Sequence, residues 1–351
     1  MLKKTKIIKV GNILIGGGNP VVVQSMTKTP TRDVEATVAQ IRSLEEAGCQ
    51  IVRIAVPHEE DAWALKDIRK QVTIPLVADI HFNHTFALAA IEAGFDKIRI
   101  NPGNIGNESK VRLIVDAAKE KGIPIRVGVN SGSLELDIRR KYKHVTADAL
   151  VESALKNIRM LEKFKFTNIA VSVKSTSVLT TIQAYRKLSH KVDYPLHIGM
   201  TEAGIPKIGI IRSSIGIGAL LADGIGDTIR VSLTSDPVEE VKVAFDILKS
   251  LEMISRGVTI LSCPTCGRCS IDVERIASEV YERTNRVRTP MTVAIMGCEV
   301  NGPGEAADAD VGLAGGNGVG LIFREGTVVR KVPEDEMVDA LVDEIESMAI
   351  K

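Results

Sequence analysis

Eight short apolar stretches, rich in β-branched residues, recur through residue 233, and a segment of helical length follows each one. The stretches are residues 21–26, 51–56, 76–80, 97–101, 125–129, 169–173, 196–200 and 228–233. The helical segments are residues 33–47, 58–71, 85–93, 110–121, 147–164, 178–191, 211–222 and 237–251. Strands that alternate with helices form parallel sheets, and eight such units close into a barrel. The repetition therefore predicts an α/β fold, a (β/α)8 TIM-type barrel.

A doubly wound open sheet is the alternative arrangement of such units. Its dinucleotide-binding form carries a G-x-G-x-x-G turn after the first strand, and this chain has none there. The count of eight and the missing turn favour the barrel. Before the first unit, apolar runs at 7–10 and 13–15 flank a glycine, which indicates a short hairpin that plugs one end of the barrel.

A smaller domain is expected after the barrel. Strand-like runs at 259–261, 292–296, 310–315, 319–324 and 327–332 combine with helical patterns at 272–286 and 334–348. This mixture predicts an α+β domain. We therefore expect a substrate-binding barrel at residues 1–252 and a second domain at 259–351 that carries four of the five cysteines.

The composition argues against several classes of partner. A net charge of +1 and an aromatic content of 3% give neither the basic surface nor the stacking side chains of a nucleic-acid-binding protein. No apolar run is long enough to cross a membrane, and no signal-peptide core follows the basic start. We expect a cytoplasmic protein with no nucleic-acid and no membrane partner.

Polar residues occupy the later part of the predicted strands, where a buried parallel sheet should be apolar. They are Arg53, Asp79, His81, Arg99, Asn101, Arg126, Asn130, Lys174, Glu202 and Arg230. The carboxyl ends of barrel strands meet at one face, where barrel enzymes build their sites. Cations in this excess require an anionic ligand unless some point outward, and guanidinium groups match phosphate oxygens well. Asp79 and His81 either take part in proton transfer or only orient the mouth of the barrel.

The cysteines form a second centre. Cys263, Cys266 and Cys269 make a C-x-x-C-x-x-C turn, and Cys298 lies in a later segment rich in glycine. Clustered cysteines in a long chain indicate a metal or redox centre rather than a disulfide framework. Their spacing alone leaves three alternatives open: structural zinc, a four-cysteine iron–sulfur cluster for electron transfer, and a catalytic cluster with one position free of cysteine.

Six motifs, spread over essentially the whole chain, occur together in one known family. They are D-I-H-F at 79–82, R-I-N-P-G-N-I-G at 99–106, T-E-A-G at 201–204, G-I-G-D-T-I-R-V-S-L at 224–233, C-P-T-C at 263–266 and N-G-P-G-E at 301–305. With these motifs the chain closely resembles the bacterial 4-hydroxy-3-methylbut-2-enyl diphosphate synthases of isoprenoid biosynthesis.

The resemblance implies an iron–sulfur oxidoreductase that reductively opens 2-C-methyl-D-erythritol 2,4-cyclodiphosphate with two electrons. It implies a [4Fe-4S] cluster on Cys263, Cys266, Cys298 and Glu305, with reduced flavodoxin or ferredoxin as electron donor. Cys269 departs from the family pattern: the C-x-x-C-x-x-C turn could let Cys269 replace Glu305 as a ligand in some state, although Glu305 is the preferred ligand. Asp79, His81, Glu202 and Glu305 would be the catalytic residues, and the cations and asparagines of the barrel would bind the substrate. The alternative is a non-catalytic electron carrier or a structural zinc protein.

The length of the linker bears on the assembly. The eighth barrel helix ends at the face opposite the substrate, and residues 252–258 reach roughly 25 Å when extended. A barrel with its loops is about 30 Å tall. We therefore expect a head-to-tail homodimer in which each cysteine domain closes the barrel of the other chain.

Overall fold

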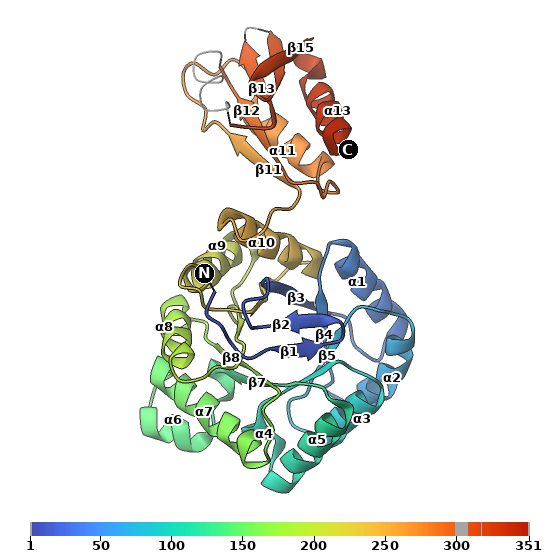
Figure 1. Ribbon diagram of the computed structural model, residues 1–351, viewed down its shortest axis with the longest axis vertical. Coiled ribbons are helices and arrows are strands. Elements are labelled where there is room, and N and C mark those ends of the chain that lie inside the picture. The colour runs from blue at the N-terminus through green and yellow to red at the C-terminus, as the bar shows by residue number, and fades with distance from the viewer. Residues whose placement is uncertain (1, 299–307, 317, 350–351) are drawn as a thin grey trace. The chain divides into compact units, whose positions relative to one another are not determined.

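In the computed structural model, residues 2–298, 308–316 and 318–349 are described. The chain divides into two compact units, residues 1–253 and residues 254–351, each of which is built around its own sheet (Figure 1). Within the described residues, no helix has both the length and the apolar character needed to cross a membrane.

Eight parallel strands make up the sheet of the first unit, in the order β8-β7-β6-β5-β4-β3-β10-β9. They are β3 (Val22–Met26), β4 (Ile51–Ala55), β5 (Leu76–Asp79), β6 (Lys97–Ile100), β7 (Ile125–Asn130), β8 (Ile169–Lys174), β9 (His197–Ile198) and β10 (Thr228–Ile229). A bridge between Val171 and Leu196 joins the two outer strands. The predicted (β/α)8 barrel is thereby confirmed.

Helices surround this barrel (Figure 1). They are α1 (Val34–Glu46), α2 (Glu59–Lys70), α3 (His84–Glu92), α5 (Glu108–Lys121), α7 (Ala147–Lys163), α8 (Val178–Ser189), α9 (Pro206–Ala222) and α10 (Pro237–Ser250). Side-chain oxygens cap the amino ends of several of these helices. The carboxylate of Asp33 accepts from Ala36 N–H, and that of Asp236 from Val238 N–H. Such caps satisfy amide groups that have no partner within the helix.

The predicted hairpin lies across one end of the barrel (Figure 1). It consists of β1 (Ile8–Val10) and β2 (Ile13–Ile15). Ile8, Val10 and Ile15 pack against Val22, Val77 and other residues near the amino ends of the barrel strands. This apolar plug closes the amino end, so a ligand can enter from the carboxyl end.

Three details differ from the expected elements. Strands β9 and β10 are only two residues long, and β9 ends just before Gly199, whose φ of +153° departs from strand geometry. Helix α9 begins at Pro206 rather than at residue 211, since the fixed φ of proline suits a first helical position. Short helices also occupy the loops after β6 and β7: α4 (Pro102–Ile105), a 3-10 turn (Ser131–Ser133) and α6 (Leu136–Tyr142).

The second unit is a mixed five-stranded sheet with helices on one face. Its strands follow chain order: β11 (Val258–Ser262), β12 (Met291–Met296), β13 (Val311–Gly316), β14 (Val319–Arg324) and β15 (Thr327–Pro333). Strands β11, β12 and β13 pair in parallel, and β14 pairs antiparallel with both β13 and β15. Helices α11 (Val273–Arg283) and α13 (Met337–Ala349) complete the unit.

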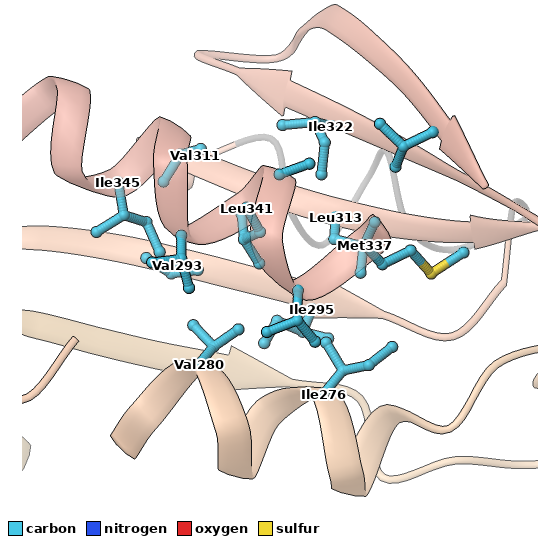
Figure 2. Packing of buried hydrophobic residues seen from close by; sticks show 14 of the residues in the cluster. Ile276, Val280, Val293, Ile295, Val311, Leu313, Ile322, Met337, Leu341 and Ile345 are labelled. Atoms are coloured by element: carbon cyan, nitrogen blue, oxygen red, sulfur yellow. The ribbon is translucent and has the colours of Figure 1, made fainter. Parts of the chain in front are cut away.

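Alternate residues of each strand point to opposite faces of the sheet, so this unit has a separate apolar cluster on each face. Val293 and Ile295 of β12 pack with Ile276 of α11 and Leu341 of α13, as Figure 2 shows. Ala294 and Met296, which point the other way, belong to a separate cluster with Cys263 at its margin. The helices thus stabilise one face of the sheet. Cys269 packs against the cluster on that face, and Cys263 borders the clusters on both faces.

Candidate functional site

A buried carboxylate at the end of β5 holds two arginines of the neighbouring strands. Asp79 pairs with Nη1 of Arg99 at 2.9 Å and with Nε of Arg53 at 3.5 Å. Although burial raises the pKa of Asp79, the charges of Arg99 and Arg53 outweigh that effect and hold this pKa well below its usual range. Asp79 is therefore ionised at neutral pH, and both guanidinium groups are oriented inside the barrel.

The next strands carry cations that form no ion pair with a carboxylate among the described residues. Arg126 of β7 is 1% exposed, and its Nε and Nη1 atoms have no hydrogen-bond partner in that part of the chain. Burial, followed by repulsion from other cations, lowers the pKa values of Arg126 and Lys174 well below their ordinary ranges. A guanidinium group keeps its proton in proteins. The buried donors of Arg126 are therefore suited to an anionic ligand.

Gly199 leaves room for the ammonium group of Lys174. A methyl group at this position would lie 2.3 Å from the carbonyl oxygen of Arg230 and 2.8 Å from Nζ of Lys174. Its positive φ is also one that residues with side chains rarely adopt. Glycine just after β9 therefore lets the side chain of Lys174 lie close to the backbone of the neighbouring strands.

A pocket of about 170 Å³ opens beside Arg99. Its lining residues are His81, Arg99, Asn101, Asn104, Asn130, Ser131, Gly132, Ser133, Thr201 and Glu202. Five predicted site residues, namely His81, Arg99, Asn101, Asn130 and Glu202, therefore meet at one cavity. The side-chain amide of Asn101 donates to the carbonyl of Ser133 at 3.1 Å, which ties together the loops after β6 and β7.

Two candidates for proton transfer line this pocket. Nε2 of His81 lies 3.4 Å from Nη1 of Arg99. Burial lowers the pKa of His81, and the nearby charge of Asp79 opposes this shift only in part. Glu202 is exposed, and its φ of +53° places it in a strained turn at the rim. His81 is thus held largely neutral, and Glu202 faces both solvent and the cavity.

The sequence analysis missed two buried charged residues, Lys97 and Glu240, and the exposed Lys28 that pairs with Glu240. Lys97 is 1% exposed and makes no hydrogen bond or ion pair with any residue that the structure describes. Glu240 of α10 is 1% exposed, and Lys28 pairs with it at 2.9 Å. Glu240 could have been recognised from helical spacing, because Pro237, Val241 and Ala244 lie on the same buried stripe.

The described cysteines of the second unit gather at one sheet edge. Cys263 directly follows β11, and Cys298 follows the neighbouring parallel strand β12 by two residues. A methyl group on Gly297 would lie 2.4 Å from Sγ of Cys269 and 3.3 Å from Sγ of Cys263. Both sulfur atoms therefore border the small space that glycine leaves open.

These thiols are chemically available to a metal cluster. Cys263, Cys266, Cys269 and Cys298 are all free of disulfides. Among the residues described, however, no three histidine, cysteine or acidic side chains are already arranged around a common metal position. Glu305, the expected fourth ligand, lies outside the described residues. Thiol donors at one edge, beside a glycine that leaves room, suit an iron–sulfur cluster.

Solved structures similar to the first unit are barrels of another activity. Dihydropteroate synthase from Vibrio fischeri aligns with a TM-score of 0.51 and 14% identity, and covers 70% of this chain and 98% of its own. The enzyme from Xanthomonas albilineans aligns with a TM-score of 0.50 and 15% identity, and covers 72% of this chain and 100% of its own. At this identity the likeness shows only the barrel fold.

Family models and curated relatives match both units. The GcpE TIM-barrel domain matches residues 5–245, and the GcpE protein C-terminal domain matches residues 259–347. Curated proteins named 4-hydroxy-3-methylbut-2-en-1-yl diphosphate synthase (flavodoxin) are similar along their whole length. The Caldanaerobacter subterraneus protein is 56% identical over 99% of this chain and 98% of its own. The Bacillus cytotoxicus protein is 57% identical over 99% of this chain and 94% of its own. The chain therefore belongs to the GcpE family.

Proposed function

We propose that this chain is a 4-hydroxy-3-methylbut-2-enyl diphosphate synthase, an oxidoreductase of isoprenoid biosynthesis, as its relatives are named. Its substrate would be 2-C-methyl-D-erythritol 2,4-cyclodiphosphate. Two electrons and two protons open the ring and release one hydroxyl group as water, which leaves (E)-4-hydroxy-3-methylbut-2-enyl diphosphate. The observation that carries the proposal is the buried, incompletely neutralised group of cations at the carboxyl ends of the barrel strands.

The barrel, residues 1–252, would bind the substrate. A cyclic diphosphate brings two negative charges, and the chain offers it Arg53, Arg99, Arg126, Lys174 and Arg230. Asn101 and Asn130 supply neutral donors at the pocket wall. Because buried cations attract phosphate far more strongly than exposed ones, these groups would fix the ring before reduction begins.

Proton delivery would fall to side chains of the same pocket. His81 and Glu202 line the cavity, and Asp79 holds Arg99 in its wall. A general acid must lie within hydrogen-bond reach of the departing oxygen. His81 and Glu202 meet this requirement for a ligand in the cavity, while the paired Asp79 acts by orienting the arginines.

The second unit, residues 259–351, would hold a [4Fe-4S] cluster on Cys263, Cys266, Cys298 and Glu305. Cys263 and Cys298 follow the adjacent parallel strands β11 and β12, and these positions, together with the space at Gly297, support this assignment. When bound, the cluster supplies single electrons, which amino-acid side chains cannot provide. The names of the relatives support flavodoxin as the donor, and ferredoxin is the alternative donor. The expected cellular compartment is the cytoplasm.

The active assembly would be a head-to-tail homodimer. Residues 251–257, which separate α10 from β11, reach roughly 25 Å when extended. Exposed isoleucines on α9 also suit a second copy, since Ile208, Ile211 and Ile215 are 43%, 54% and 53% exposed on one helical stripe. A surface helix normally presents polar residues outward, so this apolar stripe favours a protein contact.

Protein purified without oxygen provides the test. We expect about four irons and four acid-labile sulfides per chain, an EPR signal that changes with the cyclodiphosphate, and turnover with reduced flavodoxin. Zinc in place of iron would overturn the cluster. Iron with neither a substrate-dependent signal nor turnover would overturn the catalytic role and leave an electron carrier.

A further inference from the structure

A buried carboxylate on α10 contacts three parts of the barrel mouth. Glu240 is 1% exposed. Oε2 accepts from the hydroxyl of Ser25 at 3.2 Å and lies 3.6 Å from Nη2 of Arg230. Oε1 accepts from the backbone N–H of Leu233 at 3.0 Å and pairs with Lys28 at 2.9 Å. Both carboxylate oxygens therefore have polar partners, and these contacts connect β3 with the segment after β10.

Lys28 reinforces the same connection. Besides Glu240, its ammonium group donates to the carbonyl oxygens of Leu233, at 2.7 Å, and of Ser235. Lys28 belongs to the loop after β3, whereas both carbonyls belong to the loop between β10 and α10. The first and last strands of the barrel are thus fastened where their short ladder, only two paired residues, gives little support.

Glu240 lies closer to Lys28 than to Arg230. The pair of Glu240 and Lys28, at 2.9 Å, is close to neutral as a unit. Arg230 lies farther away, at 3.6 Å, and its Nε has no hydrogen-bond partner among the described residues. Glu240 therefore orients the guanidinium of Arg230 without satisfying all its donors, which leaves them for an anionic ligand.

Asp79 shows the same division in the adjacent part of the barrel. Its carboxylate pairs with Arg99 at 2.9 Å and lies 3.5 Å from Arg53. In each case one buried carboxylate binds one cation closely and holds a second at longer range. The repetition argues that Glu240 belongs to the ligand-binding arrangement and does not merely stabilise the helix.

We propose that Glu240 is a positioning residue for substrate: through Lys28 and Ser25 it fixes the loops on both sides of the β3–β10 junction, and it aims Arg230 at the diphosphate. This inference rests on the proposed diphosphate substrate. Because Glu240 is itself negative, it opposes anion affinity while it enforces geometry, and the two effects can be separated.

The experiment compares Glu240→Gln with Glu239→Gln in the holoenzyme. Glu239 is the neighbouring residue of α10, and it pairs with Lys242 at the surface. We expect E240Q to bind inorganic pyrophosphate at least as tightly as the parent in calorimetry, because a negative charge is removed. Its kcat should fall at least about tenfold, because Arg230 is no longer held in place. E239Q should match the parent in both measurements.

Further variants separate positioning from folding. Lys28→Met should lower kcat, and the double variant K28M/E240Q should lose less than the product of the two single effects, as expected for one unit. Multiplicative effects, or E240Q with the kcat of E239Q, would overturn the inference. If E240Q does not fold, parental kcat and KM in K28M would overturn it. A parent that binds no pyrophosphate would instead overturn the proposed substrate.

Discussion

At the scale of single residues, the barrel contains more buried cations than carboxylates to pair with them among the described residues. Asp79 serves two arginines, and Glu240 serves Lys28 and Arg230. Arg126 and Lys174 remain without such a partner among the described residues. Buried charges of one sign raise the free energy of the folded protein. Ligand affinity and folding stability therefore oppose each other at this site.

Asp79→Asn tests whether this carboxylate offsets the cost of the buried arginines. The variant keeps the shape of the side chain but leaves Arg53 and Arg99 without a counter-charge, so unfolding free energy should fall by about 3 kcal/mol. Urea denaturation measures this change. Asp67→Asn, which removes an exposed pair with Lys70, is the control and should cost less than about 1 kcal/mol. An unchanged midpoint in D79N would contradict the role of Asp79.

The same variant has a defined pH signature. The pKa of Asp79 is lower in the folded protein than in the unfolded chain. Its stabilisation is therefore complete above the unfolded value of about 3.9 and is lost as pH falls toward the folded pKa. In D79N this part of the acid dependence should disappear, so parent and variant curves should converge as the pH is lowered below about 4.

At the scale of secondary structure, strand direction creates both sites. Parallel strands end at one edge, so residues distant in sequence meet there without any long-range motif. The barrel cations gather in this way, and so do Cys263 after β11 and Cys298 after β12. The difference lies in what surrounds them: the barrel encloses its cations, whereas Cys266 is exposed.

Gly297→Ala tests the cysteine edge. The added methyl group would meet Sγ of Cys269 at 2.4 Å, so the cysteine turn must shift, and iron per chain should fall below roughly half of the parental value. Gly267→Ala is the control, because no atom lies within 4 Å of the added carbon there. Parental iron content in G297A would show that the cluster does not need this space.

At the scale of the whole molecule, the barrel cations and the cysteines belong to separate units that the chain joins through a short segment. The proposed head-to-tail dimer would let each barrel use the cysteines of the other chain. The isoleucine stripe of α9 provides an apolar surface for such a contact. Symmetric pairing of two copies through one surface is the commonest form of assembly.

Complementation tests this arrangement. Chains with Arg126→Met and chains with Cys266→Ser should each be inactive. Mixed dimers contain one intact barrel opposite one intact cysteine unit, so remixing should restore up to about a quarter of parental turnover. Ile211→Glu in both chains should prevent the recovery, whereas Leu113→Glu, exposed on α5, should not. No recovery in dimers that have exchanged chains would show that each chain uses its own two units.

The sequence by itself determined the barrel, because eight apolar runs with helices between them have few ways to bury their faces. It also placed the predicted cations near strand ends, since alternation and strand direction are local properties. His81, Arg99, Asn101, Asn130 and Glu202 were all predicted before their common pocket was seen. Spacing alone left three kinds of metal centre open for the cysteines, and the proposed cluster ligands come from the resemblance of the motifs to the family.

Only the tertiary structure decided which charges pair. The contacts of Asp79 with Arg53 and Arg99 depend on register between neighbouring strands. Those of Glu240 join residues more than 200 positions apart, as in its bond with Ser25. No local pattern encodes such pairing, because it arises when the barrel closes and the last helix meets the first strand. Closure therefore determines which cations are neutralised and which remain for a ligand.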